Sequence, residues 1–213
     1  AKGVIFQSQF NKLLTEKYFG EKEKSVVIHN GTSLDEIEMI PPMTHPTLDS
    51  FEKVWCCASS WRPHKRLAEN VRYFLEHSSH QDCLVIAGKD PDIEISHERI
   101  FYVGNLEWEQ LISLYRRASY FIHLSLMDHC PNVVVDAKAA GCQIICSSAG
   151  GTREIAGKDA VVISDMQWDF MPFKLYIPPR MDFSKKVKNI DHDVDLDIKG
   201  VCDSYLKFFG EII

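Results

Sequence analysis

Short apolar segments rich in β-branched residues alternate along the chain with segments in which apolar residues recur at helical spacing. We predict a strand in each apolar segment: residues 4–9, 25–31, 53–59, 83–88, 100–105, 120–125, 143–148 and 160–164. The periodic segments predict helices over residues 11–19, 65–77, 107–117 and 131–140, with a short helix near Thr152.

Strands that are apolar on both faces and separated by helices are typical of a parallel sheet, because each parallel crossover needs a connection about as long as a helix. We therefore predict an α/β fold with a Rossmann-like, doubly wound parallel sheet. The Pro-rich residues 41–50 are expected to form a linker or loop, and the aromatic-rich residues 167–186 an irregular segment. A final amphipathic helix is expected over residues 197–213.

Composition narrows the function. The 213 residues carry a formal net charge of −6, which argues against a dedicated nucleic-acid binder. Seven cysteines without a Cys-x-x-Cys pair predict free thiols, a reducing and therefore cytoplasmic location, and no metal site. No segment predicts a transmembrane helix or a signal peptide. Because the chain starts with Ala-Lys-Gly in what already resembles a strand, we expect a fragment of a longer protein.

Polar and small residues follow several predicted strands, at the edge where ligands bind in such sheets. A basic cluster follows residues 53–59, acidic Asp128 follows residues 120–125, and Gly150 and Gly151 follow residues 143–148. The basic cluster consists of Arg62, His64, Lys65 and Arg66. Cations and helix N-termini attract phosphates, and the carboxylates of Asp128 and Asp136 accept hydrogen bonds from sugar hydroxyls. The edge therefore predicts a site for a ligand with phosphates and hydroxyls.

Each of these features also has a structural interpretation. The two acids suit a loop cap and a solvated helix face, the cations suit ordinary surface charge, and the glycines suit a turn. His123 is expected in the core, whereas the role of His129 is left open. Cys130 lacks an evident base partner, so we do not expect a nucleophile there. The aromatic residues of 167–186 are expected to serve packing rather than sugar binding.

The segment DHCPNVVVDAKAAGCQIICSSAGGTREI, residues 128–155, resembles the signature of glycosyltransferase family four, the retaining enzymes of the GT-B fold. Both have an acid, seven residues, a second acid, a small-residue helix, a strand and Gly-Gly-x-x-Glu. The segments SVVIHNG, WCCASSWRPHKRLAENVRYF, CLVIAGKDPD and IFYVGNLEWEQLISLYRRASYFIHLS resemble the family in the same order. The resemblance covers about residues 1–164.

The resemblance implies roles for individual residues. Asp128 would be the catalytic residue that binds the donor sugar, and Asp136 would bind the ribose. Lys65, with Arg62 and Ser60 near it, would contact the donor diphosphate. The remaining implied donor contacts lie at Asn105 and Leu106 beside the base, at Cys130, Asn132 and Val133 by their backbone amides, and at Gly150 and Gly151.

The resemblance further implies one half of a GT-B fold with a C-terminal crossover helix. Residues 1–24 would end the N-terminal acceptor domain or link it, residues 25–196 would bind the nucleotide sugar, and residues 197–213 would form the crossover helix. The whole enzyme would move a sugar from a UDP- or GDP-linked donor, with retention and without a cofactor or metal. Its acceptor, a glycan, a lipid-linked molecule or a small molecule, would bind the missing domain, so this fragment is expected to be inactive alone. The resemblance is compatible with peripheral membrane association of the full-length protein and implies no nucleic-acid partner.

Two departures from the family pattern favour alternatives. Both acids are Asp where the family usually has Glu, which shortens each reach by roughly 1.5 Å. The usual Arg five residues before the Lys falls at Ser60, with Arg62 nearby. One alternative is a non-catalytic or degenerate nucleotide-sugar-binding module. Another is an epimerase or a phosphorylase of the GT-B fold.

Overall fold

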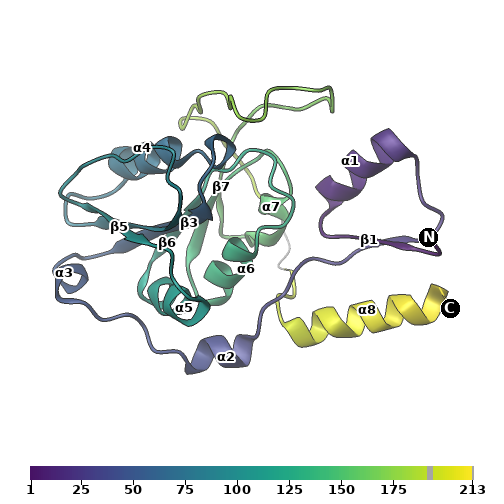
Figure 1. Cartoon of the computed structure of the whole chain (residues 1–213), viewed down its shortest axis with the longest axis horizontal. Coiled ribbons are helices and arrows are strands. Elements are labelled where there is room, and N and C mark those ends of the chain that lie inside the picture. Colours follow the sequence, from purple (N-terminus) through teal and green to yellow (C-terminus); the bar gives the residue numbers. More distant parts are fainter. Residues whose placement is uncertain (191–193, 213) are drawn as a thin grey trace.

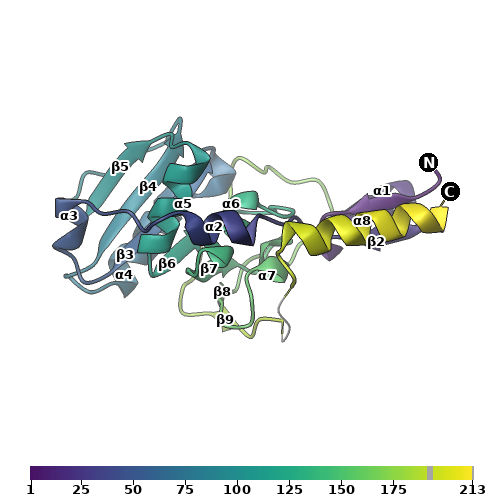
Figure 2. The same cartoon turned by 90° about the horizontal axis from the view of Figure 1, so that it is seen from below.

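A seven-stranded sheet forms the larger part of the protein, in the order β5-β4-β3-β6-β7-β8-β9 (Figures 1 and 2). The computed structural model describes residues 1–190 and 194–212. The strands are β3 (Val54–Ser60), β4 (Cys83–Lys89), β5 (Ile100–Gly104), β6 (Tyr120–His123), β7 (Gln143–Ser147), β8 (Val161–Ile163) and β9 (Lys186–Val187). Neighbouring strands are parallel except β8 and β9, which are antiparallel. The predicted parallel sheet is therefore confirmed.

Helices cover both faces of this sheet, because successive side chains of each strand point to opposite sides. On one face, Trp55 and Cys57 of β3 pack with Phe74 of α4 (Leu67–His77). On the other face, Cys56 and Ala58 belong to the core formed with α5 (Trp108–Arg117), α6 (Asn132–Ala139) and α7 (Thr152–Ile155). The two apolar layers explain why the strands read as near-continuous apolar runs.

The ladder between β3 and β6 is short. Only Trp55 and Cys56 of β3 pair with β6, although β3 continues to Ser60 alongside β4. Beyond this ladder, side chains from the turn and helix that follow β3 form hydrogen bonds with the backbone of Leu124. The amide of Leu124 donates to Asn70 Oδ1 at 3.0 Å, and its carbonyl accepts from Arg66 Nη1 at 3.3 Å. The carboxyl ends of β3 and β6 are thus spread apart by polar side chains.

A smaller lobe is built from the two ends of the chain. Strand β1 (Val4–Phe6) pairs in parallel with β2 (Ser25–Val27), and α1 (Gln9–Phe19) and α8 (Ile198–Ile212) flank this pair (Figures 1 and 2). The predicted final helix is confirmed. Strand β2, which the sequence analysis assigned to the second domain, pairs here with β1. The domain boundaries after residues 24 and 196 stay predictions.

Three short helices were missed by the sequence analysis, as was the two-residue strand β9. Helix α2 (Leu34–Met39) begins after Ser33, whose side chain accepts from the amide of Glu36. Helix α3 (Pro46–Asp49) lies within the segment predicted as a loop, so that prediction is wrong for these four residues. Pro46 occupies the first turn, where its missing N–H costs no hydrogen bond, and Leu48 is buried against the core. The third is the 3-10 helix η1 (Pro63–Lys65).

All seven cysteines are free thiols, and six of them are buried, including Cys56, Cys57, Cys83 and Cys146. In the described part of the chain, no helix combines the length and the apolar character that a membrane crossing requires.

Two glycines with positive φ test how closely the strands approach. A Cβ at Gly88 of β4 (φ +112°) would lie 1.8 Å from the carbonyl oxygen of Ser59 on β3, whereas a Cβ at Gly104 (φ +69°) would meet open space. We expect Gly104→Ala to lower the free energy of unfolding by about 1–2 kcal/mol from backbone strain alone. Gly88→Ala should lower it by at least roughly 2 kcal/mol more. Urea unfolding of both variants checks this, and equal losses would contradict the close approach of β4 to β3 at Gly88.

Candidate active site

The site begins where the strand order reverses. The chain runs from β3 outward through β4 to β5, and then returns to β6 on the other side of β3. In open α/β sheets, this switch point opens a crevice at the carboxyl ends of the two central strands, and ligands bind there. Lys65 follows β3 and Asp128 follows β6, and the two side chains form an ion pair of 2.5 Å. Topology thus brings these two predicted residues together.

Asp128 is held from two sides. The same oxygen that pairs with Lys65 lies 3.0 Å from Nε2 of His123. Burial alone would raise the pKa of the Asp128 carboxyl, but the hydrogen bond from His123 and the charge of Lys65 outweigh it and hold that pKa well below its ordinary value. Asp128 therefore stays a carboxylate at neutral pH. His123 is buried as predicted, but its partner makes it part of the site.

A further nitrogen group, His64, lies near this carboxylate. His64, on η1, has a buried Nδ1 atom without a hydrogen-bond partner among the described residues. Burial lowers the pKa of His64, and the charge of neighbouring Lys65 lowers it further. A buried ring nitrogen without a partner beside a lysine is a candidate contact for an anionic ligand.

Asp136 has different surroundings from Asp128. It lies on α6, is 9% exposed, and accepts hydrogen bonds from Thr32 and from Nε1 of Trp108 at 3.3 Å. Burial raises the pKa of its carboxyl, although the two hydrogen bonds oppose part of that shift. Thr32 and Trp108 were missed by the sequence analysis. Trp108 could have been noticed because it opens α5, two residues after the predicted base contact Leu106.

The loop before α6 is held by Asn30, which the sequence analysis also missed. Its side-chain amide donates to the carbonyl of Cys130 at 3.0 Å and to Oδ1 of Asn132 at 2.7 Å. Burial raises the pKa of the Cys130 thiol to about 11, so this cysteine is protonated at neutral pH. That state agrees with the expectation that Cys130 is not a nucleophile. Val133 follows in the first turn of α6.

Gly150 and Gly151 let the turn after β7 lie against the Asp128 loop. A Cβ at Gly150 (φ +94°) would lie 2.6 Å from the carbonyl oxygen of Asp128, and one at Gly151 would lie 2.0 Å from that of His129. The amide of Gly151 also donates to the carbonyl of Asp128 at 2.7 Å. The glycines therefore fix the backbone that carries Asp128; whether they also touch a ligand stays a prediction.

Glu154 joins the small lobe to this site. Its carboxylate accepts from the amides of Gln9 and Phe10, at 2.7 and 2.9 Å, and lies 3.1 Å from Nε2 of His29. Burial would raise the pKa of Glu154, but these hydrogen bonds lower it overall. The acid of the Gly-Gly-x-x-Glu pattern thus caps the first turn of α1.

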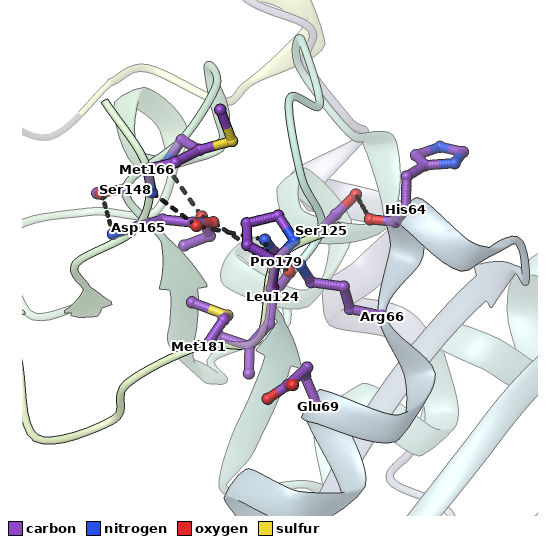
Figure 3. A network of polar contacts seen from close by, with 12 residues as sticks. His64, Arg66, Glu69, Leu124, Ser125, Ser148, Asp165, Met166, Pro179 and Met181 are labelled. Carbon is purple, nitrogen blue, oxygen red and sulfur yellow. Dashed lines mark hydrogen bonds and ion pairs between the residues drawn. The ribbon is translucent and has the colours of Figure 1, made fainter. Parts of the chain in front are cut away.

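Arg66, which was predicted as part of the basic cluster, is buried and points into the fold. Its side chain is 1% exposed and pairs with Asp165, whose side chain is 3% exposed (Figure 3). Arg66 also donates to the carbonyl of Pro179 at 3.1 Å. Asp165 in turn accepts from the hydroxyl of Ser147 at 2.6 Å. The guanidinium is therefore used inside the fold, and it anchors the segment between β8 and β9.

The two remaining predicted residues lie at the surface. Ser60 ends β3 and is exposed, and Arg62 is exposed directly before η1. Among the described residues, the side chain of Arg62 has no hydrogen-bond partner. The structure therefore leaves Arg62 free to turn toward a ligand at Lys65.

The opposite pKa shifts of the two acids give a pH prediction. The folded-state pKa of Asp128 lies below the unfolded value of about 3.9, so its charge stabilises the fold above that pH and the contribution is lost as the pH falls below it. For Asp136 the folded-state pKa is raised, so its ionisation opposes folding as the pH rises. At neutral pH we expect Asp128→Asn to cost roughly 2 kcal/mol and Asp136→Asn to be neutral or stabilising. Urea unfolding between about pH 3 and about pH 7 measures this. Equal effects of both variants would contradict the assignment.

The buried pair gives a second prediction. Arg66→Ala leaves the Asp165 carboxylate buried without its partner, and we expect a loss of about 3–5 kcal/mol in unfolding free energy. The double variant Arg66→Met with Asp165→Leu should recover a large part of this loss, because it removes both charges. Thermal and urea unfolding compare the two. A loss below about 1 kcal/mol in the single variant would mean that the pair is not desolvated.

Comparison with known proteins identifies the family of this chain. The model of the family described as glycosyl transferases group 1 matches residues 52–170. No curated protein matches. Among solved structures, HepE from Anabaena in complex with UDP-glucose aligns with a TM-score of 0.61 and 18% identity, over 77% of this chain and 50% of HepE.

Two further structures give the same result. Sucrose-phosphate synthase from Thermosynechococcus elongatus aligns with a TM-score of 0.60 and 18% identity, over 77% of this chain and 45% of that one. WaaG, a glycosyltransferase involved in lipopolysaccharide biosynthesis, aligns with a TM-score of 0.57 and 12% identity, over 80% and 50%.

The chain thus spans about half the length of these structures, and the likeness confirms the predicted Rossmann-like half of a GT-B fold. Because the family model covers more than half of the 213 residues and follows the predicted signature, the chain belongs to the glycosyl transferases group 1 family.

Proposed function

We propose that this chain is the donor-binding part of a retaining glycosyltransferase that takes a sugar from a nucleotide diphosphate sugar. The observation that carries the proposal is the Lys65–Asp128 pair at the switch point of the sheet. The complex of HepE with UDP-glucose supports UDP as the nucleotide, with GDP as the alternative. The acceptor would contact parts of the enzyme outside this chain as well, and the chain alone would bind the donor without completing transfer.

Lys65 would stabilise the leaving group, which is the nucleoside diphosphate. Its ammonium pairs with Asp128. An arriving diphosphate offers a larger negative charge, so the ammonium would turn toward it, with Arg62 and His64 close by. Positive groups fixed where negative charge develops lower the barrier to departure of the nucleoside diphosphate. No proton transfer to the leaving group is needed, because a diphosphate leaves as an anion.

Asp128 would hold the sugar. A carboxyl whose pKa is held well below neutrality accepts hydrogen bonds and does not donate a proton. It would therefore bind hydroxyls of the donor sugar and fix the reacting carbon beside the acceptor, which is a positioning effect. His123 keeps this carboxylate in place when Lys65 turns to the phosphate.

Asp136 would accept from the ribose hydroxyls. Its carboxylate already accepts hydrogen bonds from Trp108 and Thr32. These bonds orient the carboxylate, and its oxygens can accept further hydrogen bonds. Trp108 is 36% exposed and lies beside the loop that carries Asn105 and Leu106, so we place the base on that side. Cytoplasmic location and peripheral membrane association stay predictions.

A degenerate, non-catalytic module is the second candidate. It is favoured by the shorter acids and by Ser60, and by the fact that Asp128 is engaged by two partners within the chain. Asp128→Glu and Asp136→Glu separate the two cases. Tighter donor binding in these variants would indicate a decayed site, whereas weaker binding would indicate a site adapted to aspartate.

Calorimetric titration with UDP and GDP tests the proposed function. We expect saturable binding of one of them, much weaker binding of the matching nucleoside, and at least about tenfold weaker binding by Lys65→Ala. Lys199→Ala is the matched control, because Lys199 is an exposed lysine on α8 that pairs with Asp35. Absence of binding by both nucleotides, or equal binding by Lys65→Ala and Lys199→Ala, would overturn the proposed donor site.

A further inference from the structure

A second cleft lies beside the Asp128 loop. It has a volume of about 770 Å³, within the roughly 300–1,000 Å³ typical of small-molecule sites. Its walls come from α1, β2, the Asp128 loop, the turn after β7, and the segment that joins β8 to β9. The lining includes Phe10, Met127, Gly150 and Trp168. None of the residues assigned to the donor lines it except Gly150.

The order of the strands places this cleft at one end of the proposed donor. With the base beside the end of β5 and the diphosphate at the β3–β6 switch point, the sugar extends toward β7. The cleft continues in the same direction, over β7 and β8, and it begins at Met127 and Gly150, which flank Asp128. A molecule in this cleft would therefore lie next to the transferred sugar.

One wall of the cleft is aromatic. The ring of Phe10 lies 5.5 Å from that of His129 and 6.1 Å from that of Trp168, and Trp168 lies 5.0 Å from Phe170. The hydroxyl of Tyr18 on α1 donates to the carbonyl of Phe170. The segment 167–186, which was expected to serve packing alone, thus brings its tryptophan to the edge of the site.

This wall is held in position rather than loosely attached. The buried Arg66 binds both Asp165 and the carbonyl of Pro179, so it fixes the segment on either side of Trp168 (Figure 3). Arg66 directly follows Lys65, and the turn that carries the proposed phosphate contact also anchors the aromatic wall. The aromatic wall therefore has a fixed position relative to the Lys65 turn.

The polar groups of the cleft suit a neutral ligand with hydroxyls. Its acids are already engaged, Asp165 by Arg66 and Glu154 by the amides of α1. Arg153 donates through Nη2 to the carbonyl of Lys188, and its buried Nε has no hydrogen-bond partner among the described residues. The side-chain amides of Gln9 and Gln167 line the cleft and have no hydrogen-bond partner in the described part of the chain. Each amide both donates and accepts, which matches a hydroxyl group.

We infer that this cleft binds a hexose unit of the acceptor, with the apolar face of the sugar against Trp168 and Phe10 and its hydroxyls on Gln9 and Gln167. A sugar ring has an apolar face and a polar edge, and an aromatic wall with nearby amides offers both contacts. That the bound hexose belongs to the acceptor rests on the proposed function. It assigns part of the acceptor site to this chain, although the acceptor was expected to bind the missing domain.

The test uses the 213-residue chain and three methyl hexosides as probes: methyl α-glucoside, methyl α-mannoside and methyl β-galactoside. Saturation-transfer NMR reports their binding, with and without UDP or GDP. We expect saturable binding of at least one glycoside, weakened at least about tenfold in Trp168→Ala. Trp168→Phe should retain most of the binding, because it keeps an aromatic face. Phe209→Ala, which removes an exposed ring on α8, is the matched control.

Nucleotide binding is measured on the same samples and separates the two proposals. Nucleotide binding that persists in Trp168→Ala also shows that this variant is folded. Nucleotide binding without any saturable glycoside binding, or glycoside binding that Trp168→Ala and Gln167→Ala leave unchanged, would overturn the hexose site and leave the donor site standing. Glycoside binding that depends on Trp168 without nucleotide binding would support the hexose site and overturn the donor site.

Discussion

The buried charge of Arg66 is the constraint around which the site is arranged. A guanidinium with 1% exposure needs partners, because an unpaired buried charge costs several kcal/mol. The partners are Asp165 and the carbonyls of Leu124 and Pro179, and they come from the end of β6 and from the segment between β8 and β9. Satisfying one side chain therefore fixes two segments at the same edge of the sheet. It also fixes the turn on which Lys65 lies.

The consecutive cations Lys65 and Arg66 show how burial divides their roles. Arg66 is enclosed, and its two terminal nitrogens bond Asp165 and two backbone carbonyls, so it serves the fold. Lys65 is 19% exposed and shares its carboxylate with His123, so it can exchange that partner for a ligand without leaving Asp128 unpaired. The surroundings of the two acids, Asp128 and Asp136, differ as well. His123 and Lys65 lower the pKa of Asp128, whereas burial raises the pKa of Asp136, which is held by the neutral donors Trp108 and Thr32.

The small lobe contributes to the site through Glu154 and α1. Because the carboxylate of Glu154 caps the first turn of α1, Phe10 has a fixed position relative to the turn after β7. Gly150 and Gly151 bring that turn against the Asp128 loop, since any larger side chain would meet backbone oxygen there. The proposed donor cleft and the proposed hexose cleft are thus joined by backbone contacts rather than by a flexible connection.

The sequence by itself determined the parallel sheet, its main helices, the family, and the basic and acidic residues that follow the strands at their carboxyl ends. These follow from periodicity and from motifs within about 30 residues, which a single chain displays directly. Only the tertiary structure decided that Arg66 binds Asp165, 99 residues away, and that Trp108 and Thr32 hold Asp136. It alone placed the aromatic segment beside the site and gave α3 its single turn. These contacts join distant segments, and their energies depend on burial, which no local pattern records.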